Sequence, residues 1–200
     1  MDSIRKLMSL GINTPDVMVL ACREDVYSFI KSEFNNWEKV SIRTDNKRGK
    51  AVYEKWGLPF YPNRSQEKAL KILGKELLSL VDDKIDILVA KGINPEESLL
   101  SGKYMRGDVE VVEYIIGPST VRDVDEKIPP SWNVYGETMP HDLSRLQLPI
   151  NLPYSLFHTV EQTDRGFRTP YILEFSVYPY GVGKLNKPLI FWEVIEEKTG

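Results

Sequence analysis

The sequence has almost no cysteine and no long apolar run. Cys22 is the only cysteine among 200 residues, so the chain cannot form an internal disulfide, and this favours a reducing compartment. No stretch approaches the roughly 20 apolar residues that cross a bilayer. The N-terminus carries an early acid, Asp2, and no apolar signal core. We therefore expect a cytoplasmic protein with no membrane partner.

Several motifs of known chemistry are absent as well. The sequence contains no G-x-x-x-x-G-K-[ST], no G-x-G-x-x-G, no G-x-S-x-G and no C-x-x-C. The two histidines, His141 and His158, lie far apart in the sequence and have no cysteine neighbours. A zinc site is therefore not expected, and both histidines are more typical of surface or packing residues. Cys22 adjoins an apolar run, which favours a buried structural thiol over a nucleophile.

Composition indicates a folded chain with a sizeable core. Apolar residues make up 42% of the sequence and charged residues 28%, which argues against global disorder. The net charge of -3 gives no reason to expect nucleic acid as a partner. Positive charge is nevertheless dense between Lys39 and Lys55. A solvated basic loop and an anion-binding loop both fit this segment, while an oligonucleotide-binding role ranks last.

Hydrophobic periodicity predicts alternating helices and strands in the first half of the chain. The expected elements are helices over 3–10, 23–34 and 65–81, and strands over 17–21, 39–43 and 85–91. Gly11 is placed to end the first helix. The pattern breaks from Thr44 to Asn63, among glycines and prolines, and predicts a long ordered loop there.

The second half of the chain predicts mainly strands. A strand over 109–116 ends at Gly117 and Pro118, and strands over 171–177 and 189–194 flank a hairpin turn. The segment 123–153 carries five prolines and predicts irregular structure, with a helix near 141–146. These elements indicate an α+β fold. It would form a single compact domain over 1–200, with two lobes, 1–94 and 95–200, as a further interpretation.

Short segments follow one another in the order of a known family. The matching segments are Leu10–Leu20, Val40–Asp45, Leu88–Ile93 followed by Ser101–Gly102, Val112–Thr120, Ile172–Phe175 and Ile190–Val194. In this order they resemble the ATP-grasp nucleotide-binding region of phosphoenolpyruvate synthase and pyruvate phosphate dikinase. The family has V-R-S-S, V-V-Q-x-M-V, I-E-W and L-Q-A-R-P at the corresponding places. The resemblance implies an ATP-grasp-like fold of two small α+β lobes with mostly antiparallel sheets.

The sequence also departs from that family. The early G-G-K is missing, the final Q-A-R-P is replaced by Glu193–Glu196, and the phosphate-loop serines become Thr44 and Asp45. A chain of 200 residues has no room for the phosphohistidine domain and the substrate barrel. We therefore do not expect the complete phosphoenolpyruvate synthase activity from this chain alone.

The resemblance implies a site for ATP and Mg²⁺. Two carboxylates on neighbouring strands would ligate the metal, while cations would contact the phosphates and a hinge would contact the adenine. The implied metal ligands are Glu174 and Glu193, the catalytic cations Arg43 and Lys91, and the nucleotide-binding residues Arg43, Lys47, Lys50, Lys91 and Ile93. Solvent-facing strand carboxylates and a surface pair of Arg43 with Asp45 or Glu38 remain the simpler interpretations.

Two functions stay open from the sequence. One is an ATP-grasp-like protein that binds ATP with magnesium and acts as an ATP-dependent ligase or phosphotransferase on a small carboxylate substrate. The lost motifs motivate the other, a degenerate module that binds a nucleotide or a protein partner without catalysis.

Overall fold

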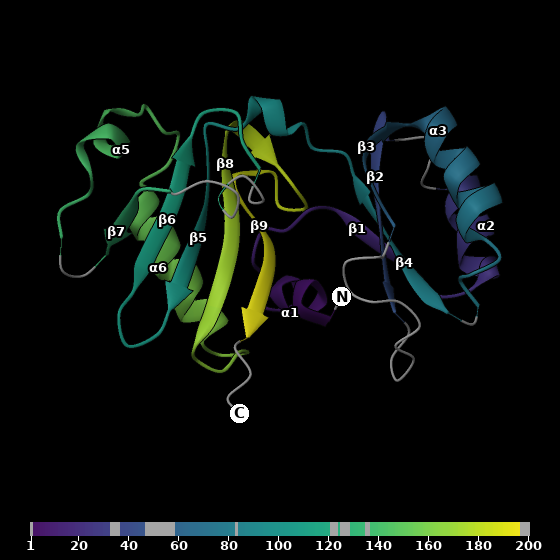
Figure 1. Ribbon diagram of the computed structural model, residues 1–200, viewed down its shortest axis with the longest axis horizontal. Helices are drawn as coiled ribbons and strands as arrows, with labels where there is room; N and C mark the ends of the chain where they lie inside the picture. The colour runs from purple at the N-terminus through teal and green to yellow at the C-terminus, as the bar shows by residue number, and fades with distance from the viewer. Residues whose placement is uncertain are drawn as a thin grey trace. The chain divides into compact units, whose positions relative to one another are not determined.

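The computed structural model describes residues 2–32, 37–46, 59–82, 84–120, 124, 129–134 and 137–196 (Figure 1). The chain forms two compact units. The first comprises Asp16–Ile93, and the second comprises Asp2–Pro15 together with Asn94–Gly200. Residues 2–15, which the expected lobe 1–94 includes, therefore group with the second unit. Each unit contains one antiparallel sheet and its own core, so the fold is α+β with two antiparallel sheets.

The first unit is a four-stranded sheet with helices on one face (Figure 1). The strand order is β1-β4-β2-β3, with β1 at Val17–Leu20, β2 at Lys39–Asn46, β3 at Phe60–Ser65 and β4 at Ile85–Lys91. The helices are α2 at Arg23–Ser32 and α3 at Gln66–Lys71, and α3 continues as the π-helix Ile72–Leu77. Alternation along β4 buries Ile85, Ile87 and Val89 against the helices and leaves Leu88 on the open face.

The prediction of a long loop over 44–63 is wrong at both ends of the segment. Strand β2 continues to Asn46, and Phe60–Ser65 forms β3, while residues 47–58 lie outside the described part. Pro62 is one of the glycines and prolines that predicted the loop, because proline cannot donate to a strand ladder. It is accommodated here because β3 is an edge strand, where one side of the backbone needs no partner strand.

The second unit is a five-stranded sheet in the order β7-β6-β5-β8-β9. Its strands are β5 at Leu100–Arg106, β6 at Val111–Ile116, β7 at Ser131–Asn133, β8 at Tyr171–Val182 and β9 at Lys187–Glu196. Its helices are α1 at Asp2–Ser9, α5 at His141–Arg145 and α6 at Leu152–Thr163, with a 3₁₀ turn at Pro95–Glu97. Among the described residues, no helix is long and apolar enough to cross a membrane.

Two elements of this unit correct the expectations from the sequence. The resemblance matched only Ser101–Gly102, to a Ser-Gly turn of the family, and no strand was expected there, yet Leu100–Arg106 is the central strand β5, paired with β6 and with β8. Helix α6 falls at the end of the proline-rich segment that predicted irregular structure. Its Pro153 lies in the first turn, where a missing N–H costs nothing, and Asn151 caps the helix by accepting a hydrogen bond from Tyr154 N at 3.2 Å.

The segment after α1 is held against the β8–β9 hairpin. Gly11 ends the helix with φ 75°, as expected, and the chain then runs along the edge of β9. The buried Asn13 side chain donates to the carbonyls of Val182, Lys187 and Leu189 at 2.8–3.2 Å, and its Oδ1 accepts from Leu185 N at 2.8 Å. Both the nitrogen and the oxygen of one buried amide are thus used to fix the hairpin.

Candidate functional site

A row of charged side chains crosses the open face of the five-stranded sheet. The strand register places Glu113 opposite Lys103, Lys103 opposite Glu174, and Glu174 opposite Glu193. Directly opposed residues in antiparallel strands project from the same face, with Cβ atoms about 4.5–5.5 Å apart. The row therefore brings together Glu174 and Glu193, the two predicted metal ligands, and adds a lysine that the sequence analysis did not single out.

A β-bulge decides which residue of β9 lies opposite Glu174. Phe175 pairs with Phe191, but Glu174 pairs with Glu193, so Trp192 is the extra residue between the two pairs. Bulges of this kind re-aim side chains on the bulged strand. Without the extra residue, Trp192 rather than Glu193 would take the position opposite Glu174. This geometry could not be read from the local sequence.

Lys103 and Glu174 form a partly buried ion pair. Lys103 Nζ lies 3.5 Å from Glu174 Oε1, and the two side chains are only 11% and 17% exposed. Lysine and glutamate are rarely this buried unless they are paired. Glu174 and Glu193 also have further interactions within the molecule.

Beside the charged row lies a network of buried hydroxyl groups. Ser101 and Ser176, both almost fully buried, share a hydrogen bond of 2.8 Å between their Oγ atoms. Trp192 Nε1 donates to Ser176 Oγ at 2.9 Å, and Ser101 Oγ donates to the Ser119 carbonyl at 2.9 Å. Fully satisfied buried networks of this kind rigidify the strands that carry them. The bulge residue Trp192 is therefore fixed by its own side chain.

The open face of the four-stranded sheet has a different character. Arg43 is exposed there and lies opposite Leu88 on one side and Phe60 on the other. Half-buried Val19 lies beyond Leu88, and the Phe60 side chain is 61% exposed. The same face also carries Asp45 and Asp86, which lie opposite each other two positions along from Arg43 and Leu88, so it combines an apolar patch with charges of both signs. Arg43 is engaged in an interaction within the molecule.

The remaining predicted site residues are placed as follows. Lys91 is the exposed last residue of β4 and lies opposite Val40. Since Val40 packs in the core, alternation puts Lys91 on the helix-covered face of this sheet and Arg43 on the open face. The structure therefore does not bring these two cations to one face. Ile93 is half-buried, just after β4, while Lys47 and Lys50 lie outside the described residues.

Metal-binding chemistry at the charged row is limited to its own carboxylates. Across the part of the chain that the structure describes, no group of three or more histidine, cysteine, aspartate or glutamate side chains could hold a metal ion. A cation here would therefore need further oxygen ligands from a substrate or from water.

Comparison with known proteins adds the fold family. No family model matches the chain, and no curated protein matches it in sequence. A RimK domain ATP-grasp protein from Sphaerobacter thermophilus superposes with a TM-score of 0.51 at 14% identity, covering 96% of this chain and 56% of the other. The chain has an ATP-grasp-like fold.

Further ATP-grasp enzymes give similar values. D-alanyl-alanine synthetase A from Vibrio cholerae gives a TM-score of 0.49 at 12% identity, covering 94% of this chain and 51% of that one. N5-carboxyaminoimidazole synthetase from Staphylococcus aureus gives 0.47 at 13% identity, covering 98% and 43%. This chain spans about half the length of these proteins. The narrower resemblance to phosphoenolpyruvate synthase and pyruvate phosphate dikinase stays a prediction.

Proposed function

We propose that this chain binds ATP with Mg²⁺ and serves an ATP-dependent ligase that activates a small carboxylate substrate. The observation that carries the proposal is the direct opposition of Glu174 and Glu193, with Lys103 beside them, on the open face of a sheet with an ATP-grasp-like fold. The likeness of fold supports nucleotide binding in general. The charged row supports the more specific proposal, because it provides carboxylates for a metal ion and an ammonium for a phosphate.

The residues present fit a magnesium ion that is shared with phosphates. Mg²⁺ is usually held in proteins by one or two carboxylates, and its other ligands are waters and substrate phosphate oxygens. Glu174 and Glu193 supply two carboxylates from adjacent strands. The ion would neutralise the charge that develops on transferring phosphoryl oxygens.

Lys103 is assigned a positioning role in this proposal. Its ammonium lies 3.5 Å from Glu174 and holds that carboxylate on the open face, where it also supplies positive charge for a phosphate.

Arg43 remains the candidate for phosphate contact in the first unit, and the apolar surface of Val19, Leu88 and Phe60 around it suits the flat face of a purine. Lys91 remains a candidate catalytic cation, and Lys91 and Ile93 remain candidate nucleotide contacts at the end of β4.

The test is thermal unfolding of the full chain with ATP, in the presence and absence of Mg²⁺. We expect a magnesium-dependent rise in Tm of roughly 3–6 °C at about ten times Kd. Glu174→Gln and Glu193→Gln should abolish the magnesium dependence, because each removes a charged metal ligand while keeping the side-chain shape. Glu161→Gln, on an exposed position of α6, is the matched control and should retain the full rise.

A Lys103 variant, a substrate screen and the magnesium dependence of the Tm shift distinguish a ligase from a non-catalytic nucleotide-binding module. Lys103→Met should weaken ATP binding and leave a smaller rise than the native chain shows. Release of ADP in a screen of carboxylates with amine acceptors would support the ligase, while binding without turnover would favour the non-catalytic alternative. The absence of any Mg²⁺-dependent shift at saturating ATP would contradict the proposal.

A further inference from the structure

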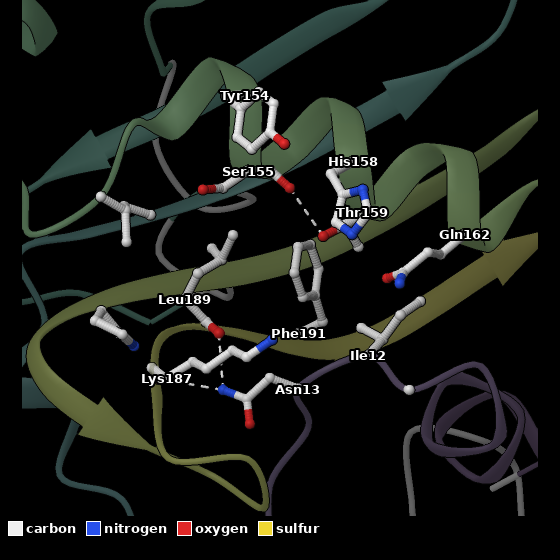
Figure 2. A pocket seen from close by; sticks show the side chains of 13 residues that line it. Ile12, Asn13, Tyr154, Ser155, His158, Thr159, Gln162, Lys187, Leu189 and Phe191 are labelled. Carbon is white, nitrogen blue, oxygen red and sulfur yellow. Dashed lines mark hydrogen bonds between the residues drawn. The ribbon is translucent and has the colours of Figure 1, made fainter.

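The helix-covered side of the second unit contains a pocket that is separate from the charged row. It has a volume of about 200 Å³ and lies between α6, the segment after α1, and β9 (Figure 2). Its floor includes Leu189 and Phe191, which alternate to the covered face of the sheet and belong to the core. Glu174 and Glu193 project from the opposite face. The pocket therefore cannot be part of the proposed metal site.

The pocket has an apolar floor and a polar rim. Ile12, Leu189 and Phe191 are at most 7% exposed and form the floor. The rim carries the Lys187 ammonium from β9 and the Gln162 amide and His158 imidazole from α6, all drawn in Figure 2. An apolar surface with a few polar groups at one side is the usual make-up of a small-molecule site.

Three polar side chains of the rim have no partner of their own. Among the described residues, the side chains of Lys187, Gln162 and His158 make no hydrogen bond or ion pair; His158 only lies parallel to the Tyr154 ring, with centroids 6.4 Å apart. The other polar groups of the pocket are satisfied: Thr159 donates to the Ser155 carbonyl at 2.9 Å, and Asn13 is fully bonded to the hairpin. Polar groups without a partner among the described residues are therefore left over in the lining of this pocket.

The charge of the pocket fixes the sign of its ligand. No aspartate or glutamate lines it, and Lys187 provides a permanent positive charge at its edge. An acidic group placed there would gain a charge-assisted hydrogen bond from the ammonium and a further one from the Gln162 amide. An apolar group on the same molecule would cover Phe191 and Leu189. Ligand sites for drug-sized molecules are about 300–1,000 Å³, so this one suits a smaller compound.

The walls of the pocket are rigid enough to be preformed. Asn13 ties the segment after α1 to the hairpin, and Phe191 N donates to the Asn13 carbonyl at 2.9 Å. Gly183, with φ 73°, lets the hairpin approach the same segment, since a Cβ there would lie 2.6 Å from the Thr14 carbonyl oxygen. A site that needs no rearrangement loses less of its binding energy to ordering.

We propose that this pocket binds a small organic carboxylate, with its apolar part on Phe191 and Leu189 and its carboxylate on Lys187 and Gln162. No covalent step is involved. The site is independent of the proposed ATP function, because the residues that form it lie on the other face of the sheet and none of them is assigned to nucleotide or metal.

Benzoate is the probe for this proposal, with amide chemical shifts of the full chain as the measurement. We expect saturable shifts centred on Ile12, Gln162 and Phe191, and much weaker binding of benzamide, which has the same ring without the charge. Lys187→Met should lower benzoate affinity about tenfold, since it removes a charge-assisted hydrogen bond. Gln162→Leu should lower it severalfold.

Lys184→Met is the matched control, because it removes the same charge from the same hairpin at an exposed position outside the pocket. Its benzoate affinity should stay within about twofold of the native value. Equal binding of benzamide, equal losses in the two lysine variants, or shifts spread away from the pocket would each overturn the proposal. Binding of inorganic phosphate in place of benzoate would also overturn it, since the apolar floor would then play no part.

Discussion

The open faces of the two sheets differ in how apolar and charged side chains are arranged on them. In the four-stranded sheet the face carries an apolar patch of Val19, Leu88 and Phe60 around Arg43, and Asp45 and Asp86 lie beyond it. In the five-stranded sheet it is crossed by four charged residues in register and by buried serine hydroxyls. Both sheets bury their other face under helices in the ordinary way. The contrast therefore lies on the faces of the two sheets that the helices do not cover.

The difference bears on which half of a nucleotide each face suits. An apolar surface with an exposed aromatic favours stacking of a flat ring, and a pair of opposed carboxylates favours a hard cation and its phosphates. Each face is chemically incomplete for ATP by itself. Taken separately, the patch around Arg43 suits a flat ring, and the row with Glu174 and Glu193 suits a hard cation.

The largest expected effect comes from moving the strand that carries Lys103. Gly102→Ala would place a Cβ 2.7 Å from the Glu113 carbonyl oxygen and 2.8 Å from Phe175 Cζ. Because both neighbours belong to strands paired with β5, relief requires the sheet to open, and we expect a loss of about 3 kcal/mol in unfolding free energy. Urea unfolding measures it. Gly74→Ala, with nothing within 4 Å of its Cβ, is the control and should not destabilise the chain.

Gly102 also shows what the sequence could and could not predict. Ser101 and Gly102 matched a turn of the resembling family, and the run from Ser101 to Lys103 lacks the β-branched residues of an obvious strand. Pairing on both sides overrides this preference in the structure. A glycine in a central strand marks a close approach of neighbouring atoms, and that was the available signal for β5.

For the rest of the site, the sequence predicted the strands but not the register between them. The strands that hold Glu174 and Glu193 follow from alternating patterns, and their hairpin is confirmed. Their direct opposition depends on one extra residue, Trp192, whose indole reaches Ser176. Long-range register of this kind is set by tertiary packing, so local sequence could not supply it. Lys103 was missed together with its strand.

A change on the apolar face should leave stability intact and alter recognition. The Phe60 side chain is 61% exposed on an edge strand, so Phe60→Ser should change unfolding free energy by no more than about 0.5 kcal/mol. If this face stacks a purine, ATP affinity should fall about fivefold or more, as loss of about 1–3 kcal/mol of stacking implies. Fluorescence titration with ATP and with inorganic triphosphate tests this contrast.

Triphosphate binding is the internal control for that variant. It should be unchanged in Phe60→Ser, because the removed ring would contact only the base. Equal losses for ATP and triphosphate would show that Phe60 acts through the phosphates or through the fold, and would remove the distinction between the two open faces.

The smallest expected effect is a pH dependence of stability that arises on the covered face of the five-stranded sheet. The Tyr114 hydroxyl donates to Asp142 Oδ1 at 3.0 Å, and burial together with this carboxylate raises the pKa of Tyr114 to about 12. An unfolded tyrosine titrates near pH 10. The folded chain therefore holds the proton more tightly, so the contribution of Tyr114 to stability is complete below pH 10 and is lost as the pH rises from about 10 to 12.

Tyr114→Phe separates the contribution of Tyr114 from the other causes of lost stability above pH 10. The variant should be slightly less stable at neutral pH, because Asp142 loses a hydrogen bond, and its stability should fall less steeply above pH 10. The open-face pair of Lys103 and Glu174 remains intact in it. Urea unfolding at a series of pH values measures the slope. An unchanged slope would mean that the ionisation of Tyr114 costs the folded state nothing, which its burial and its bond to a carboxylate do not allow.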